Sequence, residues 1–376
     1  MPVKILHTAD NHIGLPFKQY PEGVRDKLIV ERFGALERLI ETANERQADF
    51  FVVAGDLFDS IRVPVRDIRR TVQILRGFAG TAVVVVPGNH DHYAGPETEL
   101  WKRFRQEIEG AGNVDLLVSF EVKTYELHDQ QVHFFPCPCP SKTGQDSMIG
   151  WVADAARAAP AGLRIGIAHG NVTGLGLDAE GQYFNMEPSA LESAGVATWL
   201  LGHIHVPFPT AERGERSAYF MPGTHTPDSL RCRHRGAAWW IECEGDRVSA
   251  YEKLSPGRSQ FVRIEKELTS ADDVTAVLDV CRSIDPAGTI LDLQLTGRLS
   301  TAEKAVLDEG VEALRPGFLH VSDESDIHGR LDAAQIAHLY SDKGLAARLL
   351  SALLADTTHP DAVTLAHELI EEASKP

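Results

Sequence analysis

The sequence predicts an α/β (α+β) fold, and three features of the chain support this prediction. Short apolar runs that are typical of buried strands alternate with longer segments in which apolar residues recur at helical spacing. The valine run at 83–86 stops at a Pro-Gly pair, and Asn89, His90 and Asp91 follow. Other predicted strands also end in Asp, Asn or His. Polar side chains at the carboxyl ends of buried strands indicate a site at one edge of a sheet.

The first predicted strand covers residues 3–6 and leads into Asp10 and His12. In extended backbone, residues two apart point to the same side of the chain. An aspartate and a histidine on one side of a strand tip suit a divalent metal ion. An aspartate at this place fits a turn or a helix cap equally well.

A helix over residues 24–47 and a strand over 50–54 come next, because apolar residues first recur at helical spacing and then run without interruption. Strand, helix and strand form a βαβ unit, so the sheet is at least partly parallel. Asp56 follows the second strand and is therefore expected beside Asp10.

Arginines precede and begin the next predicted helix, over residues 65–77. Arg62, Arg66 and Arg69 (or Arg70) lie near one face of it, where they would either contact a phosphate backbone or form a solvated surface.

The remaining strands of the first part extend the same pattern. Residues 114–136 read as an antiparallel stretch, the strand at 163–168 ends in His169, and the strand at 198–201 leads into His203 and His205. Carboxylates, an amide and imidazoles together suit a pair of ions such as Mn, Fe or Zn. The absence of thiolates from these strand ends favours a hydrolytic pair over a structural zinc.

Composition limits the classes of function. A net charge of −17 argues against a generic basic coat for nucleic acid. The five cysteines are odd in number and contain no Cys-x-x-Cys, which predicts a reducing, cytoplasmic location without a disulfide framework. Cys137 and Cys139 fit either a metal site or, more simply, buried small residues. No apolar run approaches the ~20 residues of a membrane span, and the chain begins directly with a strand, so neither a signal peptide nor a membrane location is expected.

A basic cluster contrasts with the acidic chain. It contains Arg231, Arg233 and Arg235. The cluster would contact a DNA backbone or form an exposed turn, and the local contrast in charge favours the first interpretation.

The chain then changes organisation. Residues 246–260 read as a junction, after which strands and helices alternate in the order β-α-β-α-β. We therefore predict a first domain over residues 1–250, a small α/β domain over 261–325, and C-terminal helices over 332–376.

The blocks at the strand ends resemble those of a known family. Asp-x-His, Gly-Asp, Gly-Asn-His-Asp, a lone His and Gly-His-x-His occur in this order within residues 5–205. This order is similar to that of the calcineurin-like metallophosphoesterases, and among them to the SbcD-type DNA repair exonucleases. The opening His-Thr-Ala-Asp-x-His-x-Gly and the Gly-Asp-Leu-Phe-Asp block favour the latter. The segment 221–227 departs from the family's more usual Pro-Gly-Ser.

The resemblance implies a two-sheet sandwich flanked by helices as the nuclease domain, with residues 261–325 as a capping domain. It also implies ligand roles, with Asp56 bridging two divalent ions, manganese first among the candidates. One ion would be bound by Asp10, His12 and His205, and the other by Asn89, His169 and His203.

His90 would act on the leaving oxygen or the transition state, oriented by Asp91 or His7. His225 is a further residue that would approach the site.

The resemblance further implies function and partners: a DNA exonuclease or endonuclease in DNA repair, dimeric, working with an SMC-like coiled-coil ATPase of the SbcC type. The helices after residue 332 would dock this ATPase or pack on the cap. Two alternatives remain at this stage. One is a phosphodiesterase or phosphatase of the same superfamily that acts on small molecules, and the other is a binding scaffold with a degraded site.

Overall fold

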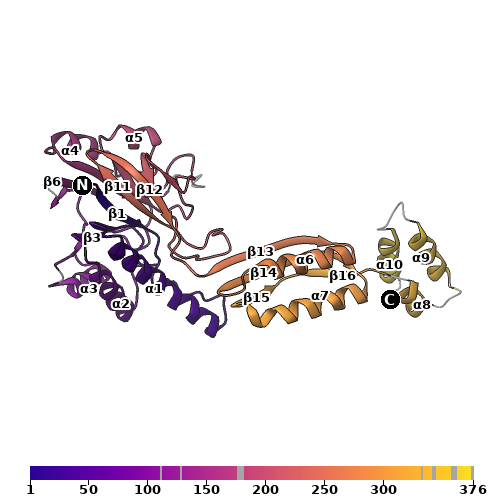
Figure 1. The fold of residues 1–376 in the computed structure, drawn as a ribbon. Coiled ribbons are helices and arrows are strands. Elements are labelled where there is room, and N and C mark those ends of the chain that lie inside the picture. The colour runs from indigo at the N-terminus through magenta and orange to yellow at the C-terminus, as the bar shows by residue number, and fades with distance from the viewer. Residues whose placement is uncertain are drawn as a thin grey trace. The chain divides into compact units, whose positions relative to one another are not determined.

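The computed structural model describes residues 1–110, 112–127, 129–175, 182–331, 333–340, 344–356 and 362–373. The chain divides into two compact units, Met1–Phe261 and Val262–Pro376. Figure 1 shows their helices and strands along the chain. Each unit has its own hydrophobic core, so each is described separately below.

The first unit contains a seven-stranded sheet. Its strands in sheet order are β4 (Val114–Leu116), β3 (Ala82–Val86), β2 (Phe50–Ala54), β1 (Val3–Thr8), β11 (Ala238–Glu244), β12 (Arg247–Leu254) and β9 (Arg213–Gly214). β1 to β4 pair in parallel, whereas β11 runs antiparallel to β1. The parallel part follows from the helical crossovers between these strands, as the βαβ pattern predicts.

A five-stranded sheet faces the first one. Its strands in sheet order are β10 (Tyr219–Phe220), β8 (Thr198–Gly202), β7 (Leu163–His169), β6 (Gln130–Cys137) and β5 (Lys123–Leu127). Phe50 and Val52 of β2 share one buried cluster with Phe134 of β6, Ile165 of β7 and Leu200 of β8. The two sheets therefore form a sandwich, which confirms the expected fold class.

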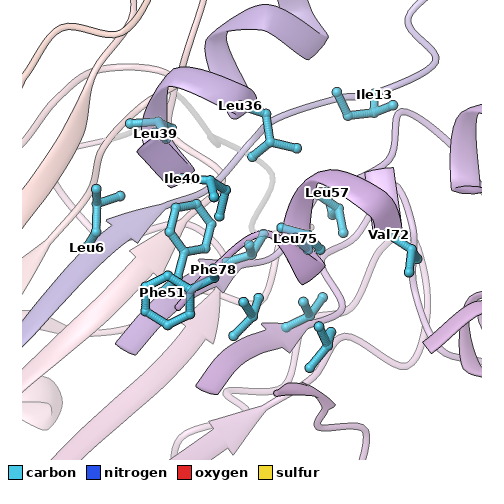
Figure 2. Close-up of a cluster of buried hydrophobic side chains, with 14 of the residues drawn as sticks. Leu6, Ile13, Leu36, Leu39, Ile40, Phe51, Leu57, Val72, Leu75 and Phe78 are labelled. Carbon is cyan, nitrogen blue, oxygen red and sulfur yellow. The ribbon is translucent and has the colours of Figure 1, made fainter. Parts of the chain in front are cut away.

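Helices cover both outer faces of the sandwich. The seven-stranded sheet carries α1 (Glu22–Glu45), α2 (Val65–Arg76) and α3 (Glu99–Ile108). The other sheet carries α4 (Val152–Ala158) and α5 (Pro188–Ser193). Figure 2 shows Leu36 and Leu39 of α1, Leu75 of α2 and Phe51 of β2 in the buried cluster between these helices and the sheet. β2 and β3 are apolar throughout because one face meets these helices and the other meets the second sheet.

The expected antiparallel stretch over residues 114–136 is partly wrong. β5 and β6 are antiparallel neighbours, but β4 pairs in parallel with β3 in the other sheet. Val114 packs in the cluster between the seven-stranded sheet and its helices. This burial favours pairing of β4 with β3, although β5 is the next strand in the sequence.

The second unit combines a four-stranded sheet with helices. Its elements are β13 (Gln260–Leu268), α6 (Ala271–Ser283), β14 (Thr289–Leu299), α7 (Thr301–Leu314), the 3₁₀ turn η1 (Arg315–Gly317), β15 (His320–Asp323) and β16 (Asp326–Gly329). β15 and β16 both pair in parallel with β14. α6 and α7 pack on this sheet through a cluster that includes Val277, Leu293 and Leu307.

Three short helices complete the described chain: α8 (Ala333–Leu339), α9 (Leu345–Ala355) and α10 (Ala362–Ala373). They share a small core that includes Ile336, Leu350 and Val363. The domain borders expected from the sequence stay a prediction, and position 332 lies outside the described residues. Among the described helices, none combines the length and the apolar character needed to cross a bilayer.

Candidate metal centre

The predicted site residues meet at one place, although they come from both sheets. Asp10, Asp56 and Asn89 follow β1, β2 and β3 of the seven-stranded sheet, while His169 ends β7 and His203 follows β8 of the other sheet. The site therefore lies where the carboxyl ends of the strands meet across the sandwich.

Backbone strain marks the strand tips. Asp10, His12, Asp56 and His203 have positive φ angles of 50°, 43°, 51° and 97°. Such conformations cost about 1–3 kcal/mol each in non-glycine residues, and they persist only where surrounding contacts impose them. The tips therefore turn sharply to bring their side chains together.

Asp10, His12 and His205 form the first group of side chains. The Nε2 atom of His205 lies 3.5 Å from Oδ1 of Asp10 and 3.3 Å from Nε2 of His12. Donor atoms of all three lie within 4.8 Å of one another, close enough to share one ion. Asp10 also accepts hydrogen bonds from the His203 backbone N–H at 3.0 Å, which ties the two strand tips together.

Asp56 lies between this group and the remaining candidates. Its Oδ2 atom is 3.2 Å from Nε2 of His169 and 3.8 Å from Nε2 of His12. Asp10, Asp56 and His169 form a second group with donor atoms within 4.8 Å. All three are completely or almost completely buried.

Asn89 and His203 close the cluster on the other side. Oδ1 of Asn89 lies 3.0 Å from Nε2 of His169 and 3.1 Å from Nδ1 of His203. An amide oxygen that faces two imidazole nitrogens suits a shared cation. The oxygen carries lone pairs, and each of the two nitrogens carries one when it bears no proton.

His90 is adjacent to the cluster. Its ring packs edge-on against that of His12, with centroids 4.8 Å apart, and its Nδ1 atom lies 3.0 Å from the backbone oxygen of Asp59. Asp91 and His7, which were expected to orient His90, make hydrogen bonds to other groups. Asp91 accepts the backbone N–H groups of Phe58 and Gly88, and His7 contacts the backbone oxygen of Leu201.

Charge in the cluster suits cations. Burial opposes ionisation of Asp56, but the neighbouring His169 outweighs it and holds the pKa of Asp56 below its usual value. Burial opposes protonation of His169, yet Asp56 raises its pKa to about 9. The buried carboxylates of Asp56 and Asp10 thus create a negative field at the cluster. Together with the mixed oxygen and nitrogen donors, this field fits divalent metal ions.

The predicted DNA-binding arginines differ in their surroundings. Arg231 lines a cavity of about 590 Å³ together with His203, His205 and Tyr183. Arg62, Arg66 and Arg233 are exposed, and Arg66 pairs with Asp67 at 3.5 Å. Arg235 is half-buried and donates to Gln260 at 3.0 Å.

The approach expected of His225 stays a prediction. This residue is fully buried, and its Nε2–H donates to the backbone oxygen of Arg32 on α1 at 2.8 Å.

The sequence interpretation missed two residues beside the cluster. Asp228 lies 2.6 Å from Nδ1 of His205, through its Oδ2 atom. Arg32 is a buried arginine of α1 whose guanidinium reaches the loops around the site. A single aspartate in a loop and a charged residue in an amphipathic helix carry no spacing signal. Only the departure of segment 221–227 from the family pattern pointed to this region.

Fold and site together define a class: hydrolases that hold a pair of metal ions at the strand tips of a two-sheet sandwich. The model of the calcineurin-like phosphoesterase family matches residues 3–207, and the chain belongs to this family.

Curated relatives are similar at modest identity. The DNA double-strand break repair protein Mre11 of Aeropyrum pernix is 28% identical over 275 residues, which cover 70% of this chain and 64% of that protein. The uncharacterised metallophosphoesterase YhaO of Bacillus subtilis is 26% identical over 336 residues, covering 82% of this chain and 76% of YhaO. The SbcD polypeptide of the nuclease SbcCD of Escherichia coli is 34% identical over 94 residues, covering 24% of this chain and 22% of SbcD. The chain thus spans less than two-thirds of these Mre11 and SbcD relatives.

Proposed function

We propose that this chain is a metal-dependent DNA nuclease, an exonuclease or endonuclease that hydrolyses phosphodiester bonds with two metal ions. The observation that carries the proposal is the buried cluster of carboxylate, amide and imidazole donors beside the cavity that Arg231 lines. Among the relatives, one is named for DNA double-strand break repair and another as part of a nuclease, which supports DNA as the substrate.

Within this proposal, the donor atoms divide into two ligand sets around Asp56. Asp10, His12 and His205 hold one ion. Asn89, His169 and His203 hold the other, with Asp56 between the two sets. Two bound ions would lower the pKa of a water molecule and neutralise charge on the phosphate. The mixed oxygen and nitrogen donors suit Mn, Fe or Zn, and manganese is the first candidate among these.

His90 serves as the proton-transferring residue in this proposal. The backbone oxygen of Asp59 can only accept, so Nδ1 of His90 carries the proton in their 3.0 Å contact. Nε2 is then the atom that exchanges a proton with the substrate. The backbone N–H of His90 donates to Asp56 at 2.8 Å, which fixes the residue next to the metal ligands.

DNA would be held by local positive charge, since the whole chain carries a net charge of −17. Arg231 is the first candidate because it lines the cavity beside His203 and His205. Arg233 and Arg235 belong to the same loop. Arg62, which precedes α2, and Arg66, in its first turn, would extend the contact.

Partners and location are part of the same proposal. The nuclease would act in DNA repair as a homodimer, with an SMC-like coiled-coil ATPase, in the cytoplasm. α9 and α10 support an ATPase contact, because they expose Leu345, Leu349, Leu365 and Leu369 by 80%, 45%, 59% and 56%. Exposed apolar side chains gathered on short helices are typical of a protein-binding surface.

The test compares DNA with a small diester. The purified chain with Mn²⁺ is incubated with end-labelled duplex DNA, with single-stranded DNA and with bis-p-nitrophenyl phosphate. We expect shortened DNA products that disappear when EDTA removes the metal. Cleavage of the small diester without cleavage of either DNA would instead favour a small-molecule phosphodiesterase or phosphatase. A chain that binds Mn²⁺ but cleaves none of the three substrates would contradict a hydrolytic function.

A further inference from the structure

Arg32 of α1 is an arginine buried inside the first unit, with an exposed fraction of 1%. Its Nε and Nη2 groups donate to the backbone oxygen of Asn11 at 2.9 and 2.7 Å. Its Nη1 group donates to the backbone oxygens of Thr226 and Pro227 at 3.4 and 3.2 Å. Burying a guanidinium costs free energy, so the hydrogen bonds that satisfy its N–H groups indicate a specific structural role.

These acceptors belong to the two loops that border the metal cluster. Asn11 lies between Asp10 and His12, both of which belong to the first group of donors. Thr226 and Pro227 directly precede Asp228. One planar guanidinium thus links the loop after β1 to the loop that carries Asp228, and its fixed geometry leaves little freedom between them.

Asp228 contacts His205, a candidate metal ligand, at the ring nitrogen that does not face Asp10. Its Oδ2 atom lies 2.6 Å from Nδ1 of His205, while Nε2 of the same ring lies 3.5 Å from Asp10. Because an ionised carboxylate only accepts hydrogen bonds, Nδ1 of His205 carries a proton. Nε2, on the other edge of the ring, is then the atom that can hold a metal ion.

Charge also links the two residues. Burial lowers the pKa of Arg32, and the negative charge of Asp228 is the leading opposing effect. Burial likewise disfavours ionisation of Asp228, but its contact with His205 outweighs this and holds the pKa of Asp228 below its usual value. The charge of Asp228 therefore favours the buried guanidinium of Arg32.

We propose that Arg32 and Asp228 are a pair of positioning residues that hold His205 and the loop of Asp10 and His12 in place for one metal ion. The inference rests on the metal-binding role proposed for this cluster. Neither residue touches the substrate in this proposal. A carboxylate behind a ligating histidine fixes its tautomer and ring orientation, and loss of such a partner typically weakens metal affinity by about 10–100-fold.

The test measures Mn²⁺ binding to the metal-free chain by calorimetry, without DNA. Asp228→Ala and Arg32→Met should each weaken the binding of one ion by about 10–100-fold and leave the other ion nearly unchanged. The double variant should bind no more weakly than the weaker single variant, because the two residues act through the same ligands. If the losses of binding free energy in the two single variants add in full in the double variant, the two residues do not act as a pair. Wild-type affinity for Mn²⁺ in Asp228→Ala would overturn the role of Asp228.

Matched controls separate this effect from general damage. Arg38→Met removes another arginine of α1 that donates to a backbone oxygen, that of Pro256 at 2.7 Å. Asp115→Ala removes a carboxylate that accepts a side-chain hydrogen bond, from Tyr125 at 2.6 Å. Both controls should keep wild-type affinity for both ions. An equal loss in the controls would mean that any disturbance of the unit weakens the site, and would contradict the proposal.

A second measurement uses the unchanged chain, so it holds even if the variants do not fold. In ¹⁵N-edited histidine spectra with Zn²⁺ added, His205 should keep its Nδ1 proton while the Nε2 resonance shifts. Binding of Zn²⁺ through Nδ1, or loss of the Nδ1 proton, would overturn the inference. Neither measurement depends on DNA cleavage. A chain that passes both but leaves DNA intact would refute the nuclease proposal alone.

Discussion

At the scale of single residues, Asp56 lies between the group of Asp10, His12 and His205 and the remaining candidate ligands. Its carboxylate lies near His169 and His12 and accepts the backbone N–H of His90. It is buried, so its charge is poorly screened and acts strongly on whatever cation lies beside it.

Replacing Asp56 by Ala should therefore remove metal and activity together. The remaining imidazoles would face the ions with one buried carboxylate fewer. We expect calorimetry to show loss of at least one Mn²⁺ ion and diester hydrolysis to fall to background. A variant that keeps both ions would contradict the bridging position.

His90 should separate metal binding from chemistry. His90→Asn should keep both ions and DNA binding, yet cut diester hydrolysis by about 10²–10⁴-fold, the usual contribution of a positioned acid or base. Metal counts and DNA-binding curves on the same preparation decide the question. His90 also lies within 4.8 Å of donor atoms of His12 and Asp56. Loss of one ion in the variant would therefore make His90 a ligand instead.

At the scale of elements, the tips of β2 and β3 approach each other closely at Gly88. A Cβ atom on Gly88 would clash with both Oδ1 and the backbone nitrogen of Asp56. This contact requires glycine, because backbone cannot move aside as a flexible side chain would.

Gly88→Ala should accordingly lower the free energy of unfolding by about 1–3 kcal/mol, the usual cost of overpacking. It should also weaken Mn²⁺ binding, since Asp56 must shift. Gly150→Ala is the control, because a Cβ atom there meets nothing within 4 Å. Urea unfolding and calorimetry on both variants provide the comparison. Equal unfolding midpoints and equal Mn²⁺ affinities in the two variants would show that the strand tips are less tightly packed than the structure indicates.

The loop between β10 and β11 carries the predicted DNA contact. Replacing Arg231, Arg233 and Arg235 by Ala should weaken DNA cleavage and flatten its dependence on salt, because fewer counterions are released on binding. Cleavage of bis-p-nitrophenyl phosphate should survive, since none of the three is a proposed metal ligand. Unchanged DNA cleavage at several salt concentrations would make the loop an ordinary surface turn.

At the scale of the whole molecule, α8, α9 and α10 form a small cluster with its own core. The leucines of α9 differ in their exposure. Leu353 packs against the core, whereas Leu345, Leu349 and Leu354 are exposed by 80%, 45% and 36%. Exposed leucines are available to a partner without unfolding the cluster.

Leu345→Glu combined with Leu349→Glu should abolish binding of the coiled-coil ATPase and leave Mn²⁺-dependent cleavage unchanged. Glutamate at exposed positions leaves the core of the helices intact. Val306→Glu is the control, because Val306 is 55% exposed on α7 of the same unit. Pull-down with the ATPase and a nuclease assay provide the two readouts. Binding that survives the double change would place the partner elsewhere.

Much of the first unit could be predicted from local patterns. The helix expected at 24–47 is α1, and the apolar runs at 50–54 and 83–86 are strands buried on both faces. The placement of β4 could not be predicted, because three residues carry no signal for the sheet they join. The hydrogen bond from the His225 ring to α1 could not be predicted either, because the two partners are far apart in sequence.

The sequence by itself determined the family and the candidate donors, because strand ends and short polar blocks are local features. Tertiary structure alone decided how these donors divide into groups and what supports them. Asp228 and Arg32 come from a loop and a helix that lie far from His205 and Asp10 in sequence, and only packing brings them together. Their roles depend on burial and on the direction of single hydrogen bonds, and neither property is encoded in residue spacing.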